Sequence, residues 1–197
     1  MSRKVFDKLM SAGGVVLVVV LLVAGGLMTW GHSFVNSNVH DQLAMQQIYF
    51  PPKAAFAHPK AGTEITPSMI PSVSQFAGKQ LLTGQQAKVY ANDFIAVHLS
   101  NMPYHGVYSK ISAASLANPN NAQLTALKGT AFTGTTLRGL LLEAYAFSEI
   151  GVILLWGAIA SFALAAILAV LVGLGVWHAA RTTEEERLLA PKPVAAA

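Results

Sequence analysis

The sequence contains no cysteine among its 197 residues. No disulfide can therefore hold any part of the chain together, and no cysteine is present for lipid attachment or for a metal site built from thiolates. A domain of this chain that lies in an oxidising compartment must be held by packing or by a partner.

Charged residues are also scarce: they make up 11% of the chain, whereas 53% of it is hydrophobic and the mean hydropathy is +0.48. This composition is more apolar than that of an ordinary soluble domain. Residues 12–31 contain no charged residue, and residues 150–180 contain none unless His178 is protonated. At about 1.5 Å per residue, each run covers the roughly 30 Å of bilayer hydrocarbon. The sequence therefore predicts two transmembrane helices.

The first run has an alternative interpretation, because a short basic segment followed by apolar residues is also typical of a secretory signal. Residues 1–8 read MSRKVFDK and fit the basic segment of such a signal. However, no site of the A-x-A type closes the run. We therefore expect a retained anchor.

Basic residues near the two runs predict the orientation, since the cytoplasmic flanks of membrane helices are rich in lysine and arginine. The flanks facing residues 32–149 are nearly bare, with Arg138 the only basic residue from 130 to 149 and none from 32 to 52. The opposite flanks carry Arg3, Lys4, Lys8, Arg181, Arg187 and Lys192. We therefore expect a plasma-membrane protein with both termini in the cytoplasm. Because the basic residues are divided among separate flanks, the isoelectric point of 9.4 does not indicate nucleic-acid binding.

These boundaries define five expected segments. They are a cytoplasmic N-terminus (1–11), a first transmembrane helix (12–31), an extracytoplasmic helical domain (32–149), a second transmembrane helix (150–180) and a cytoplasmic tail (181–197).

The region between the spans is predicted to be helical, since alternation of the strand type is not sustained anywhere in it. Residues 38–50 form one expected helix, which Pro51 and Pro52 should end. Residues 85–99 form the most amphipathic helix, whose apolar face needs a partner surface. From about Thr135 the chain is expected to run as one helix into the second span. The predicted fold class is all-α, with two transmembrane helices flanking the helical domain and the second span continuous with a long outer helix.

Tryptophan and small residues mark two expected sites on the spans. Trp30, Trp156 and Trp177 are predicted membrane-interface anchors, and the last two lie about 31 Å apart along a helix. Small residues recur at every fourth position of the second span and predict a helix-packing interface. They are Gly157, Ser161, Ala165, Ala169 and Gly173. Either the first span or a partner subunit would fill this groove.

No catalytic, cofactor-binding or metal-ligating residues are predicted. The histidines lack the spacing of a metal site, and no nucleophile elbow or phosphate-binding glycine loop occurs. His98 is expected to be a core histidine with a backbone partner, and Glu143 and Glu149 to be solvated or interface residues. With no Asp, Glu, Lys or Arg inside either span, a proton or ion path through this chain alone is not expected.

Three segments, DQLAMQQIYFPPK, AKVYANDFIAVHL and LRGLLLEAYAF, resemble in this order the motifs of uncharacterised two-pass membrane proteins from actinobacteria. The resemblance covers most of the chain. It implies the same two-span topology and brings no established activity.

The function expected from these observations is that of a non-catalytic accessory or structural subunit of a larger membrane complex for respiration, transport or envelope assembly. Its expected partners are other integral membrane subunits and the lipid bilayer, with no nucleic acid and no identified small-molecule substrate. The alternative is a free-standing, membrane-anchored sensor or binding protein whose outer helical domain takes a lipid or peptide ligand.

Overall fold

The computed structural model describes residues 3–60 and 63–181, so most of the predicted cytoplasmic tail lies outside the described residues. Within these ranges the chain is helical, and its only β contact is an isolated antiparallel bridge between Tyr49 and Gln80. The all-α fold class is confirmed. The chain divides into two compact units, which are described separately here. The two-helix unit comprises Met1–His32 and Ile153–Ala197, and the helical domain comprises Ser33–Val152.

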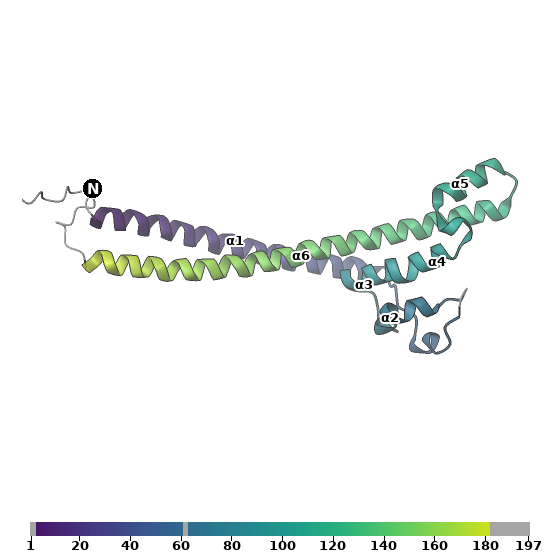
Figure 1. Ribbon diagram of the computed structural model, residues 1–197, viewed down its shortest axis with the longest axis horizontal. Coiled ribbons are helices and arrows are strands. Elements are labelled where there is room, and N and C mark those ends of the chain that lie inside the picture. The colour runs from purple at the N-terminus through teal and green to yellow at the C-terminus, as the bar shows by residue number, and fades with distance from the viewer. Residues whose placement is uncertain (1–2, 61–62, 182–197) are drawn as a thin grey trace, which may run out of the picture. The chain divides into compact units, whose positions relative to one another are not determined.

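Two long helices account for most of the chain: α1 (Arg3–Met45) and α6 (Ala122–Arg181) (Figure 1). Both are long and apolar enough to cross a membrane. Only 6% of the most apolar window of α1 and 11% of that of α6 is buried, whereas the core helix of a soluble protein would be mostly buried. The expectation of two long apolar helices is therefore confirmed.

The ends of these helices differ from the predicted ones. Residues 38–45 continue the first apolar helix without a break, and α1 ends at Met45 instead of Phe50. The reason is local, because Gln47 adopts a left-handed φ of 53° and the chain beyond it extends to pair with a distant segment. In this pairing the Phe50 amide donates to the Lys79 carbonyl oxygen over 2.9 Å. The helix α1 has therefore already ended before the chain reaches the two prolines.

The helix α6 begins earlier than expected, at Ala122 and not near Thr135. Asn121 caps it, since its side-chain oxygen accepts hydrogen bonds from the amides of Gln123 and Leu124 at 3.0 and 3.1 Å. The residues from Ala122 to the expected start near Thr135 are therefore the first part of one 60-residue helix.

The helical domain also contains short elements between the two long helices. They are η1 (Lys53–Phe56), η2 (Pro67–Met69), α2 (Ile70–Val73), η3 (Ser74–Phe76), α3 (Gly84–Val89), η4 (Tyr90–Ile95), α4 (Ala96–Ser100), η5 (Pro103–Gly106) and α5 (Tyr108–Ala117). The element η4 is a π-helix and continues directly from α3 into α4.

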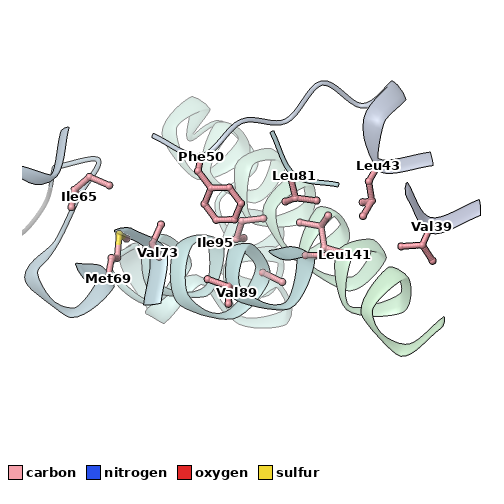
Figure 2. Close-up of a cluster of buried hydrophobic side chains, with 12 residues drawn as sticks. Val39, Leu43, Phe50, Ile65, Met69, Val73, Leu81, Val89, Ile95 and Leu141 are labelled. Atoms are coloured by element: carbon pink, nitrogen blue, oxygen red, sulfur yellow. The ribbon is translucent and has the colours of Figure 1, made fainter. Parts of the chain in front are cut away.

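The core of the domain joins side chains from α1, α6 and several of the short elements between them (Figure 2). Leu43 comes from α1, Leu81 from the segment before α3, and Leu141 from α6, and each is at most 2% exposed. Met69 and Val73, from η2 and α2, are fully buried in the same cluster. Because the chain has no cysteine, this apolar cluster is what holds η2, α2, α3 and η4 to the two long helices.

A capping box starts α3 close to α6. The Thr83 hydroxyl accepts from the Gln86 amide over 3.2 Å, and the Gln86 side-chain oxygen accepts from the Thr83 amide over 3.1 Å. The next residue, Gly84, lies so close to α6 that a Cβ there would overlap the Ser148 side chain and approach the Tyr145 Cα to 3.2 Å. The apolar face predicted to need a partner surface finds part of it in α6, since Leu99 packs on Gly134, and part of it in the core cluster, which includes Met69 and Val73.

Candidate functional site

In the two-helix unit, α1 and α6 pack along a seam with a coiled-coil spacing. Most positions of α6 in this unit that are shielded from solvent recur with alternating steps of four and three residues, and so do most of those of α1. On α6 they are Leu154, Ala158, Ser161, Ala165, Leu168, Val172, Gly175 and Ala179. On α1 they are Asp7, Ser11, Gly14, Val18, Leu21, Gly25, Met28 and His32. Gly157 on α6 and Ala24 and Gly31 on α1 are shielded as well and lie beside this series. This heptad period is typical of helices that supercoil around each other.

Glycines bring the two backbones together and fix the register. A Cβ at Gly175 would lie 3.2 Å from the Ser11 hydroxyl oxygen, and one at Gly31 would lie 3.1 Å from Leu154. Between these two contacts, a Cβ built at Gly25 would lie 2.8 Å from the Phe162 ring. As the residue number rises along α1, the number of the α6 residue that it contacts falls, so the two helices are antiparallel. Small residues at such contacts permit the close approach that stabilises helix pairs in lipid.

The predicted packing residues are divided by this seam. Ser161 and Ala165 are 8% and 1% exposed, and Gly157 meets the Met28 sulfur at 2.7 Å from a hypothetical Cβ. Ala169 and Gly173 are exposed, so they do not belong to the seam. The physical reason is the helical period, since each step of four residues advances about 40° beyond a full turn and carries a four-residue series off the contact face. Whether the last two positions meet another subunit remains a prediction.

The three tryptophans lie on the exposed surface of the two-helix unit, where membrane-interface anchors would lie. The contacts of Gly31 with Leu154 and of Met28 with Gly157 bracket Trp30 and Trp156 and place them at the same level. Both are 66% exposed. Near the C-terminal end of α6, the Arg181 guanidinium lies over the Trp177 ring, 4.0 Å from its centroid. A cation over an exposed aromatic ring suits a membrane interface.

The helical domain contains an apolar groove between its α1 and α6 segments, which we call the domain groove. Its volume is about 480 Å³. The apolar lining includes Leu140 and Phe147, which are 54% and 50% exposed, whereas Gln42, Gln46 and Glu143 add polar groups. Sequence reasoning missed this groove. The available signal was the four-residue spacing of Val35, Val39 and Leu43 in the first helix, which marks a face directed at another helix.

A row of aromatic rings crosses the domain through the π-helix. Tyr90 packs edge-on against Phe50 and at a tilt against Phe94, with ring centroids 5.2 and 4.8 Å apart. Phe94 in turn packs against His98 at 4.6 Å. Burial among these rings raises the pKa of Tyr90, and the negative charge of Glu64 raises this pKa further.

Polar side chains of the domain bind each other or the backbone in arrangements that serve packing. Arg138 donates to the Asn92 side-chain oxygen over 2.9 Å, and the Lys88 ammonium lies 4.6 Å from the Tyr145 ring centroid. His98 Nδ1 donates to the Phe94 carbonyl oxygen over 2.8 Å, which confirms the predicted backbone partner. In residues 3–60 and 63–181, no three His, Asp or Glu residues are grouped closely enough to hold a metal ion.

Comparison with known proteins adds no family. No protein-family model, curated protein or solved structure was found to match this chain.

Proposed function

We propose that this chain is a non-catalytic subunit of a larger membrane protein complex. In this proposal, α1 and α6 insert in the plasma membrane as two spans, both termini are cytoplasmic, and residues 32–149 lie outside as a docking domain for an integral membrane partner. The observation that carries the proposal is the domain groove, in which apolar side chains stay half exposed on a domain that would otherwise face water.

The composition of the domain groove fits a protein partner. Leu140 and Phe147 provide exposed apolar surface, and Gln42, Gln46 and Glu143 provide polar atoms beside it. An apolar patch beside polar side chains is the usual anatomy of a protein interface. A partner helix with apolar residues at helical spacing would bind between the two walls that α1 and α6 form.

Site-specific photo-crosslinking in the native host tests the docking role. A photoreactive residue at Leu140 should capture a specific integral membrane protein, whereas the same residue at the exposed Gln85 of α3 should not. Replacing Phe147 by serine should weaken the capture at Leu140. A chain that runs as a single monodisperse species in mild detergent, with no protein adduct at Leu140, would refute the subunit proposal.

The alternative of a ligand-binding protein is favoured by the volume of the same groove, since about 480 Å³ lies in the range of small-molecule sites. The crosslinking experiment separates the two functions. A Leu140 adduct that adds only the mass of a lipid or peptide would support the sensor or binding protein instead of the subunit.

The orientation is tested by thiol labelling, which the absence of natural cysteine makes simple. A cysteine replacing the exposed Ser109 of α5 should react with a membrane-impermeant maleimide in intact cells. A cysteine replacing Lys8, in the predicted cytoplasmic flank, should react only after the membrane is opened. The reverse pattern would overturn the proposed topology.

A further inference from the structure

A second groove lies in the two-helix unit, between the beginning of α1 and the end of α6. We call it the Asp7 groove. Its volume is about 750 Å³. Asp7 and His178 line one end, and Leu17 and Leu168 line the other, so that one end is polar and the other apolar. Gly13 also lines it and leaves space, since no atom lies within 4 Å of a Cβ built there.

The depth of the Asp7 groove matches an amphiphilic molecule in a membrane. Its polar end lies beside Trp177, one of the predicted interface anchors, because His178 is the next residue of α6. From Asp7 to Leu17 the groove follows ten residues of helix, or about 15 Å toward the hydrocarbon. A molecule that fills it needs a polar head at the interface and an apolar chain.

The carboxylate of Asp7 specifies the charge of that head. Its Oδ2 atom is buried and has no hydrogen-bond partner in the part of the chain that the structure describes. A buried carboxylate oxygen without a donor is costly, and a cationic N–H donor removes this cost most effectively. Arg181 lies three residues beyond His178 at the same end of α6, and its positive charge favours a phosphate close by. The polar end therefore fits a zwitterion with a primary ammonium and a phosphate.

We propose that the Asp7 groove binds an aminophospholipid of the phosphatidylethanolamine class, whose ammonium donates to Asp7 Oδ2 and whose acyl chain lies against Gly13, Leu17 and Leu168. The inference rests on the membrane insertion proposed above and does not depend on the subunit role. A phosphatidylcholine head carries the same charge but no N–H donor, and a phosphatidylglycerol head carries no cation. These two lipids are therefore matched controls for the ligand.

Native mass spectrometry of the purified full-length chain, with the three lipids bearing identical acyl chains, tests the proposal. The natural chain should retain phosphatidylethanolamine about tenfold or more over the other two, the size expected for one charge-assisted hydrogen bond. Asp7→Asn should abolish this preference. Gly13→Leu should reduce the binding of all three lipids, because its side chain fills the groove. Gly26→Leu, which also enters open space and does not line the groove, should bind like the natural chain.

Two results would overturn the inference. They are equal retention of the three lipids by the natural chain, and an unchanged preference in Asp7→Asn. Cell fractionation and crosslinking at Leu140 test the proposed function independently of the lipid site. A chain that is inserted and captures its protein partner but shows no headgroup preference refutes the lipid site alone, whereas a chain missing from the membrane fraction refutes the proposed function.

Discussion

Two adjacent glycines in α1 provide a strict test of the seam in the two-helix unit. A Cβ at Gly14 would overlap the Val172 side chain, whereas a Cβ at Gly13 meets nothing within 4 Å. Gly14→Leu should therefore wedge the helices apart, and Gly13→Leu should not. The two variants have the same change in volume and in helix propensity. Overpacking of this kind costs about 1–3 kcal/mol, which lowers the population of the closed pair relative to the separated one about 5- to 150-fold.

A pair of cysteines can report this closure, because the chain has no cysteine of its own. The Ser11 hydroxyl oxygen, whose place a cysteine sulfur would take, lies 3.2 Å from a Cβ built at Gly175, so Ser11→Cys and Gly175→Cys together can form a disulfide. Mild oxidation in membranes should join them quickly in the otherwise natural chain and in the Gly13→Leu background. In the Gly14→Leu background it should join them slowly. Free thiols are counted by the gel shift that a maleimide-linked polymer produces.

The same assay contains the result that would refute the reasoning. Val16 is 61% exposed and lies five residues beyond Ser11, or about 7.5 Å further along α1, so the pair Val16→Cys and Gly175→Cys should remain reduced. If this control pair oxidises as fast as the pair at 11 and 175, the register is wrong. If Gly14→Leu leaves the rate at 11 and 175 unchanged, the glycines do not set the approach of the helices.

Three further predictions concern the packing of the chain. Ala165→Leu should slow the disulfide between positions 11 and 175, because Ala165 is 1% exposed in the seam, and the exposed Ala169→Leu should not; loss of the native complex in Ala169→Leu alone would locate a partner contact there. Gly106→Ala should lower the melting temperature more than Gly78→Ala. Both glycines have positive φ, 65° and 71°, but only at Gly106 would a Cβ crowd the Leu99 backbone. Because the folded pKa of Tyr90 is raised above its ordinary value near 10, the contribution of Tyr90 to stability is fully present below pH 10 and is lost as pH rises through the folded pKa. Melting between pH 9 and pH 11 should therefore decline less steeply in Tyr90→Phe, and an equal decline would contradict the shift.

The sequence predicted best where a single property decides the structure. Length and the absence of Asp, Glu, Lys and Arg identify two apolar helices, because neither property depends on what the helix contacts. His98 was likewise predictable, since a half-buried ring in a helix finds the carbonyl oxygen four residues before it. The helix exit was harder to place. Pro51 and Pro52 forbid continuation at their own positions but do not prevent an earlier end at Met45, which depends on pairing with residues near Gln80.

The packing face of α6 was only partly predictable, for a geometric reason. The sequence shows a series of small residues at every fourth position. The contact face of a helix pair, however, follows alternating steps of four and three residues. Ser161 and Ala165 satisfy both rules, and Ala169 and Gly173 satisfy only the first. The partner helix decides between them, because a residue such as Val172 becomes part of the seam only by facing Gly14.

The short helices of the domain depend on α6 in a way that the missing cysteines make necessary. Gly84 lies against Ser148, and Leu99 packs so closely on Gly134 that a Cβ there would lie 2.9 Å from its side chain. Between these two contacts Arg138 donates to Asn92. As the residue number rises through the short helices, the number of the α6 residue that each contacts falls. These contacts hold the short helices to α6 in a chain that cannot form disulfides. An unbroken α6 therefore serves both units, as one wall of the seam and as the support of the domain, which gives a physical reason for a helix far longer than a membrane span requires.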